Sequence, residues 1–354
     1  MAEEKKAKRG PHYKVEPLKY DEITVAAVQM NPKPVDSRNP AKGIKENLER
    51  MLLLCDAAPT WPPGPVHLIA FPEFTLTGFD TAWTREDWLR VAIMVPGPET
   101  ELIGKKAREL GCYIEFASHT QDPDWPGHFF NSSLIVSPEE KVIHQHWKPY
   151  MGFPGNLEYS TTVHDVLDEF LERYGWDAVW PVARTDIGNI ATYVCSEGFA
   201  PETARVFALN GAEILVRSIG GGGAVYDIPC IGDPMIRMRS DCAASHVYGV
   251  YASAGSGWYA GAKSAAENNF GGGSMIVDPF GRVLRQANDS REQILKETIP
   301  IAVFRAKHSI PMIRTEIYVP AYEQHPGRFP PNMYSEYLPT DLSDAFQRSL
   351  KHIR

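Results

Sequence analysis

The chain has 354 residues, of which 43% are hydrophobic and 23% are charged, and these are ordinary values for a globular protein. A formal net charge of −8 and the lack of a long basic run argue against binding to nucleic acid or to an anionic membrane surface. The five cysteines are odd in number and form no C-x-x-C motif, so we expect neither a disulfide framework nor a zinc site, and a reducing, cytoplasmic location. No apolar run of about 18 residues predicts a membrane span, and the charged N-terminus does not resemble a signal peptide.

In the first half of the chain, short apolar strands alternate with helices. Residues 1–20 are polar and predict a flexible arm. Buried strands are expected at Ile23–Met30 and Val66–Phe71, with a helix at Ala41–Ala57 between them. The further elements expected here are a helix at Glu99–Leu110, a strand at Cys112–Ser118, and a hairpin of Asn131–Val136 with Val142–His146.

The second half begins with an amphipathic helix at Val163–Tyr174, which lies outside the alternation and is interpreted as an insertion. Because hairpins are mixed with strand–helix alternation, we expect parallel and antiparallel strands in one domain at 21–305. Residues 306–354 are rich in proline and predict an extended C-terminal tail. The remaining predicted elements are strands at Val179–Thr185, Ile190–Val194, Ile214–Ser218 and Val247–Ser253, helices at Pro201–Asn210 and Met235–Ser245, a hairpin of Ser274–Val277 with Val283–Gln286, and an edge strand at Ile299–Phe304.

Three predicted strands run into a residue with catalytic potential. Glu73 follows the second strand, Lys148 follows the first hairpin, and Cys195 ends the strand that precedes the helix at Pro201–Asn210. In open α/β sheets, functional groups gather at the carboxyl ends of strands. These three residues are therefore the candidates for a reactive site.

Each candidate has a chemical argument and a structural alternative. Glu73 is expected to be poorly solvated, which raises its affinity for a proton and suits a general base, although a surface carboxylate is the alternative. Lys148, if buried, needs a carboxylate partner, and a surface lysine is the alternative. Cys195 at a strand-to-helix turn faces a helix dipole that favours thiolate, and the N–H of Ser196 is placed to meet an oxyanion. The alternative is a buried core cysteine.

Other reactive motifs are missing from the sequence. It contains neither G-x-S-x-G nor H-E-x-x-H, and the run Gly220–Gly223 is not followed by the lysine of a P-loop. His144 and His146 alternate on a predicted strand, but no third metal ligand accompanies them. We therefore expect no metal and no cofactor.

Several short segments share an order and spacing that, taken together, form a specific signal. These are AAVQM (26–30), FPEFTLTGF (71–79), HWKPY (146–150) and VCSEGFAPE (194–202), supported by Asn131-Ser132-Ser133, GAEILVRS (211–218) and SMIVDPFGRVL (274–284). On these motifs, about residues 22 to 305 resemble the nitrilase superfamily of carbon–nitrogen hydrolases, in its amidase and N-carbamoyl amidohydrolase branch.

The resemblance implies an α/β fold, a four-layer αββα sandwich with two mixed sheets. It implies a catalytic Glu–Lys–Cys triad at Glu73, Lys148 and Cys195, and a further glutamate at Glu158 that positions substrate and shares in proton transfer. The implied activity is hydrolysis of a non-peptide carbon–nitrogen bond in a small amide or N-carbamoyl substrate, through a thioester. It also implies a homodimer or an assembly of dimers, with the tail at a subunit interface.

Two departures from the family pattern leave the substrate subclass open. Ser196-Glu197 follows the cysteine, and Trp147 stands before Lys148 where the family usually has arginine. Conversion of a nitrile to acid and ammonia is therefore an alternative, and a catalytically silent scaffold is an alternative of another class. Arg217 is a candidate to bind a substrate carboxylate, with an interface salt bridge as the alternative. Aromatic residues that line a pocket or belong to the core are Phe79, Trp147, Tyr150, Phe153 and Trp258.

Overall fold

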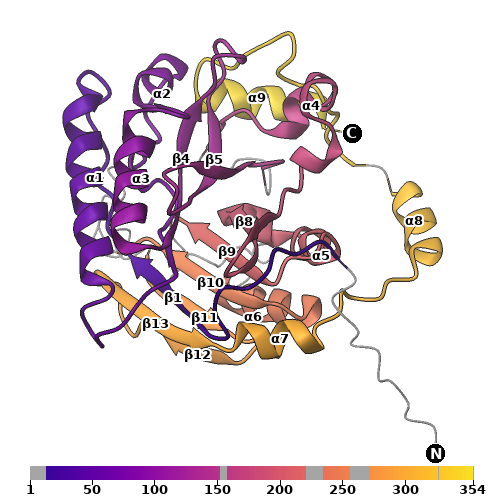
Figure 1. The fold of residues 1–354 in the computed structure, drawn as a ribbon. Coiled ribbons are helices and arrows are strands. Elements are labelled where there is room, and N and C mark those ends of the chain that lie inside the picture. Colours follow the sequence, from indigo (N-terminus) through magenta and orange to yellow (C-terminus); the bar gives the residue numbers. More distant parts are fainter. Residues whose placement is uncertain (1–12, 152–157, 221–233, 256–270, 326, 354) are drawn as a thin grey trace, which may run out of the picture.

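A computed structural model describes residues 13–151, 158–220, 234–255, 271–325 and 327–353. Two mixed β-sheets lie face to face, and helices cover the outer face of each (Figure 1). Within the described residues, the first sheet has the strand order β13-β1-β2-β4-β5-β6, with β3 paired to β4. Its strands are β1 (Ile23–Gln29), β2 (Leu68–Ala70), β3 (Ile93–Met94), β4 (Tyr113–Gln121), β5 (Phe130–Val136), β6 (Val142–Trp147) and β13 (Gln293–Ile299).

The second sheet has the order β12-β11-β10-β9-β8-β7 among the described residues. Strands β8, β9 and β10 are parallel, and the outer pairings of this sheet are antiparallel. In the first sheet β1, β2 and β4 form the parallel centre, β3 also pairs in parallel with β4, and the remaining pairings are antiparallel. The strands are β7 (Ala183–Thr185), β8 (Gly188–Val194), β9 (Ile214–Ile219), β10 (Tyr248–Ser253), β11 (Met275–Val277) and β12 (Val283–Gln286).

Helices connect many of the strands along the chain and cover the outer faces of the two sheets. The 3₁₀ turns are η1 (Val163–Val166), η2 (Trp176–Ala178) and η3 (Cys195–Phe199). The α-helices are α1 (Pro40–Ala57), α2 (Arg85–Val91), α3 (Pro98–Leu110), α4 (Leu167–Tyr174), α5 (Pro201–Leu209), α6 (Pro234–Ser245), α7 (Ile301–Lys307), α8 (Thr315–Glu323) and α9 (Leu342–His352). In the described part of the chain, no helix combines the length and the apolar character needed to cross a bilayer.

Alternation along the strands builds three separate apolar layers. In β1, Val25 faces the second sheet and packs with Ile214 and Val250, whereas Ala26 faces the opposite way, toward α1 and α3. In β9, Leu215 faces outward and packs under α5 and α6. One layer therefore lies between the sheets and one under each helical layer, which confirms the predicted four-layer αββα sandwich.

The structure corrects two sequence predictions near the C-terminal end of the chain, and most of the predicted N-terminal arm lies outside the described residues. The run Ile299–Phe304, predicted as a strand, instead ends β13 and begins α7, because Pro300 lies at the helix start, where a missing N–H costs no hydrogen bond. The predicted extended tail at 306–354 contains α8 and α9. Residues 1–12 of the predicted flexible arm lie outside the described residues, but Tyr13 donates a hydrogen bond of 2.8 Å to Glu213.

The predicted insertion helix is present as η1 and α4, and it packs against the C-terminal part of the chain. Phe170 of α4 is fully buried with Met333 and Tyr334. Trp147, at the end of β6, belongs to the same apolar cluster. The insertion and the C-terminal segment therefore lie together behind the strand that leads to Lys148.

Candidate active site

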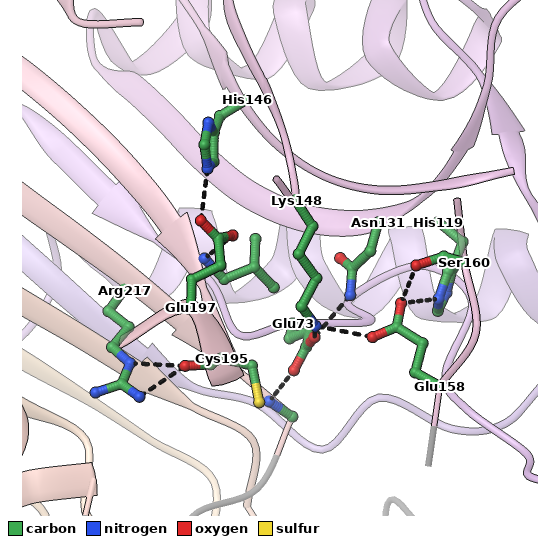
Figure 2. Close-up of polar contacts among 12 residues, drawn as sticks. Glu73, His119, Asn131, His146, Lys148, Glu158, Ser160, Cys195, Glu197 and Arg217 are labelled. Carbon is green, nitrogen blue, oxygen red and sulfur yellow. Dashed lines mark hydrogen bonds and ion pairs between the residues drawn. The ribbon is translucent and has the colours of Figure 1, made fainter. Parts of the chain in front are cut away.

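The structure brings Glu73, Lys148, Cys195 and Glu158 together between the two sheets, as Figure 2 shows. Glu73 follows β2 and Lys148 follows β6, both in the first sheet, whereas Cys195 follows β8 of the second sheet. The Lys148 Nζ atom lies 3.3 Å from Glu73 Oε1 and 2.8 Å from Glu158 Oε2. The Cys195 sulfur points toward the Glu73 carboxylate. Proximity of these four residues was predicted from motifs on segments far apart in the chain.

Glu73 is held by donors from both sheets. Its Oε1 accepts from Asn131 Nδ2 at 2.7 Å and its Oε2 accepts from the Gly220 N–H at 2.8 Å. Burial raises the pKa of Glu73 above its ordinary value, with Lys148 acting in the opposite direction. The carboxyl therefore has a raised affinity for a proton, in the direction that the sequence predicted.

Glu158 differs from Glu73 in its protonation. Burial alone would raise its pKa, but Lys148 and His119 together lower the pKa of Glu158 below the ordinary value. Its Oε1 bonds to His119 Nε2 at 3.0 Å and accepts from Ser160 Oγ at 2.7 Å. The pKa values of these two neighbouring carboxyls are shifted in opposite directions, which indicates different roles. Glu158 stays ionised, and Glu73 is the one that takes up a proton.

Lys148 remains an ammonium ion despite its burial. Desolvation alone would lower its pKa, but Glu158 and Glu73 raise the pKa of Lys148 above its ordinary value. A buried cation is stable only when such partners compensate for the lost water. Lys148 thus supplies a fixed positive charge beside the Cys195 sulfur.

Cys195 sits in a left-handed backbone conformation with φ of +47°. Its carbonyl oxygen accepts from Arg217 Nη2 at 2.6 Å and from Nε at 3.2 Å. A residue other than glycine in this conformation is strained, and such strain is found most often at functional sites. Arg217 is fully buried and stabilises this conformation from the neighbouring strand β9.

The thiolate predicted for Cys195 is opposed by the surroundings of the sulfur. Burial and the Glu73 carboxylate raise the pKa of the Cys195 thiol above its ordinary value, while Lys148 and Arg217 oppose them. Cys195 is the first residue of η3, and the predicted helix, α5, begins only at Pro201, so α5 does not start at the cysteine. The resting nucleophile candidate is a thiol, which needs a base to become reactive.

The predicted substrate-binding residues lie around this centre with different contacts. Phe79 is buried and stacks on Phe74 at 4.8 Å between ring centroids. Tyr150 donates from its hydroxyl to the Glu197 carbonyl at 2.8 Å. The Ser196 hydroxyl is buried and has no hydrogen-bond partner in the described part of the chain. The other two candidate aromatics, Phe153 and Trp258, lie outside the described residues.

His119 is a site residue that the sequence reasoning missed. It lies inside β4, two residues before the end of that strand, so the rule that selects residues directly after a strand does not find it. Its ring stacks on Phe74 at 5.0 Å and packs against Trp88 at 4.1 Å between centroids. These contacts fix the imidazole that holds Glu158.

The chain matches a family model described as carbon-nitrogen hydrolase over residues 24–308. The chain belongs to the carbon–nitrogen hydrolase family. This confirms the family predicted from the ordered motifs. Within the described residues, no group of three or more His, Cys, Asp or Glu side chains is arranged to hold a metal ion.

Curated relatives of this family member include formamidases. The formamidase of Helicobacter acinonychis is 30% identical over 205 residues, which cover 57% of this chain and 55% of the relative. The formamidase of Bacillus thuringiensis is 29% identical over 182 residues, which cover 50% of this chain and 48% of the relative. The chain therefore spans about half the length of the curated relatives it matches.

Solved structures of the superfamily share the fold. Nit3 of Saccharomyces cerevisiae aligns with a TM-score of 0.61 at 16% identity, covering 83% of this chain and 95% of Nit3. An amidase from Nesterenkonia sp. aligns with a TM-score of 0.58 at 17% identity, covering 88% of this chain and 97% of the amidase. At these identities the likeness concerns the fold alone.

Proposed function

We propose that this chain hydrolyses the carbon–nitrogen bond of a small amide or N-carbamoyl compound, with Cys195 as the nucleophile. The observation that carries the proposal is the Cys195 thiol turned toward a buried Glu73 of raised pKa, next to the Lys148 ammonium. The formamidase relatives support an amide substrate. A variant of the Nesterenkonia sp. AN1 amidase carries the acetamide moiety of fluoroacetamide on its active-site cysteine, which supports a cysteine nucleophile over a silent scaffold.

In the first half of the reaction, Glu73 takes the proton from Cys195 Sγ, and the thiolate attacks the carbonyl carbon of the amide. The oxyanion that forms is stabilised by Lys148 and by the N–H of Ser196. Glu73 then gives its proton to the leaving nitrogen. The carbon–nitrogen bond breaks, ammonia or an amine departs, and a thioester to Cys195 remains.

In the second half, a water molecule hydrolyses the thioester. Glu73 takes a proton from this water, and the resulting hydroxide adds to the thioester carbon. The carbon–sulfur bond then breaks, and the Cys195 sulfur receives the proton back from Glu73. A carboxylic acid leaves, and the resting thiol is restored.

Glu158 is proposed to keep Lys148 charged and to share in proton transfer and substrate positioning. Its bonds to Lys148, His119 and Ser160 support the first of these roles. Roles for Phe79, Tyr150 and Arg217 in substrate binding stay predictions. For Arg217, the two hydrogen bonds to the Cys195 carbonyl support a role in holding the nucleophile.

Ammonia release by the wild-type protein tests the reaction, measured on short amides including formamide, on N-carbamoyl compounds and on matched nitriles. Cys195→Ala is expected to abolish release. Cys112→Ala, at a buried cysteine directly before β4 of the first sheet, is the control variant and is expected to retain it. Release from nitriles alone would favour the alternative activity. Release from no compound, together with no labelling of Cys195 by an electrophile, would refute the proposal.

We also propose a homodimer or an assembly of dimers that buries α8. This helix leaves several apolar side chains exposed and is attached to α5 by a 2.7 Å hydrogen bond from Tyr322 to Glu202. The exposed apolar residues are Ile317, Tyr318, Val319 and Tyr322 in α8 and Met312 just before it. Light scattering should give at least twice the monomer mass, and Ile317→Asp should lower it. A monomer mass for the wild-type protein would refute this assembly. A cytoplasmic location likewise stays a prediction.

A further inference from the structure

Glu197, two residues after Cys195, is bound by residues from both sheets. Its Oε1 accepts from the Val194 N–H at 2.8 Å, which closes the cysteine turn on itself. Its Oε2 accepts from His146 Nε2 at 2.7 Å, and its carbonyl oxygen accepts from the Tyr150 hydroxyl at 2.8 Å. The turn that carries Cys195 is thus attached to the end of β6 at two points through a single residue.

The two attachment points lie on either side of Lys148. His146 and Tyr150 both bond to Glu197, which follows β8 of the second sheet. Lys148 lies between them in the chain and interacts with Cys195. Figure 2 shows His146 reaching Glu197 while Lys148 reaches Glu73 and Glu158. The segment 146–150 therefore carries the Lys148 ammonium ion and is also hydrogen-bonded to the turn that carries Cys195.

Both members of the His146–Glu197 pair are completely buried. The His146 ring is held by an edge contact with Phe207 at 5.3 Å and by Trp180 at 6.3 Å between centroids. A hydrogen bond to a buried carboxylate is strong, and removal of one partner leaves the other unsatisfied. Separating the two side chains would therefore cost free energy, and the pair holds a fixed geometry.

We propose that His146 and Glu197 are positioning residues that set the placement of Cys195 relative to Lys148 across the two sheets. This inference rests on the proposed function, in which Cys195 attacks and Lys148 stabilises the oxyanion. The left-handed conformation of Cys195 is strained, so its loop needs attachments that hold the sulfur in place. A displacement of about 1 Å is enough to lower a rate about 100-fold.

His144 offers a matched control on the same strand and face. Its Nε2 lies 2.9 Å from Thr192 Oγ1, so it also links β6 to the second sheet through a buried hydrogen bond. Thr192 lies within β8 rather than in the turn of Cys195. Loss of the His144 link therefore weakens the contact between the sheets without releasing the cysteine turn.

The test compares His146→Leu with His144→Leu in the full-length protein. Three quantities are measured: thermal unfolding, kcat and KM for the amide that the wild-type protein cleaves, and the rate of Cys195 alkylation by iodoacetamide. Both variants are expected to unfold at lower temperature. Only His146→Leu should lower kcat, by about 10- to 100-fold with KM nearly unchanged, and slow alkylation by about 10-fold, because the thiol no longer faces its base.

His146→Gln should recover most of the kcat lost in His146→Leu, because its amide nitrogen reaches the position of Nε2 and donates to Glu197. Equal effects of His146→Leu and His144→Leu on kcat and alkylation would overturn the proposal, and so would a Gln variant that folds but remains as slow as the Leu variant.

Tyr150→Phe serves as a second variant if His146→Leu does not fold. It removes only one hydroxyl and is expected to lower kcat several-fold with KM unchanged. A raised KM with unchanged kcat would instead assign Tyr150 to substrate binding and overturn its part in positioning. Alkylation by iodoacetamide needs no amide substrate, so the positioning test stands even if the wild-type protein releases no ammonia and the proposed function fails.

Discussion

Replacement of Lys148 by methionine removes the charge at the centre of the site while keeping the length of the side chain. In the wild-type protein the ammonium lies 2.8 Å from Glu158 and 3.3 Å from Glu73, and all three side chains are almost fully buried. Glu73 has a raised pKa and is able to accept a proton, which relieves its charge. The pKa of Glu158 is lowered chiefly by Lys148 against the effect of burial, so Lys148→Met leaves Glu158 as a buried charge without its cation.

Removal of one partner from a buried ion pair costs about 3–5 kcal/mol. Glu158 keeps its bonds to His119 and Ser160, so we place the loss of stability for Lys148→Met near the lower limit, at about 3 kcal/mol. For a chain of this length each kcal/mol lowers Tm by about 2 °C, which gives a fall of about 6 °C. Activity should be lost as well, because the developing oxyanion loses the ammonium ion that stabilises it.

Urea unfolding near pH 8 and near pH 5 measures the effect and its cause. Without Lys148, the folded-state pKa of Glu158 rises above its unfolded value, so the variant is relatively more stable at low pH and loses stability as pH rises. Glu158→Gln added to Lys148→Met should restore part of the stability near pH 8 but none of the activity. The reasoning fails if Lys148→Met lies within about 1 kcal/mol of wild type near pH 8, or if the double variant is the less stable of the two.

Further predictions concern the base, the cysteine turn and a second buried carboxyl. Glu73→Gln should lower kcat about 10²- to 10⁴-fold in ammonia-release assays, because the thiol loses its base. Gly198→Ala places a Cβ 2.4 Å from Arg217 Cζ, so it should displace Arg217 from the Cys195 carbonyl and lower both kcat and Tm. Burial raises the pKa of Glu115 to about 8, so wild-type stability should fall as pH rises from 5 toward 8, and Glu115→Gln should flatten that dependence in unfolding experiments.

The sequence was sufficient to predict residues that the structure brings together, because each of them follows an apolar strand. A buried strand fixes where the next residue emerges, so local patterns made Glu73, Lys148 and Cys195 candidates, and the resemblance of the ordered motifs to one family joined them into a predicted triad. Contacts between the two sheets were not identifiable in this way. His146 bonds to Glu197 across 51 positions of sequence, and no periodicity or motif within either segment indicates that partner.

The errors at the chain end have a related cause. A six-residue apolar run such as 299–304 is compatible with a strand or with a buried helical turn, and periodicity does not separate the two. The outcome was decided by β1, which pairs with residues up to Ile299 and leaves the following residues to turn away as α7. The boundaries of α5 and α6 were predictable to within one residue because helix signals are local, such as Pro201 at the start of α5.

The packing behind β6 also explains one departure from the family pattern. Trp147 stands before Lys148, where the family usually has arginine. In the sequence analysis this difference left the substrate subclass open. In the structure, Trp147 faces away from Lys148 and packs against Phe170 of the insertion, in the cluster that also contains Met333. An arginine there would bury a charge among aromatic rings. Trp147 therefore packs with the insertion and the C-terminal segment that cover the outer face of β6, which accounts for this departure by packing.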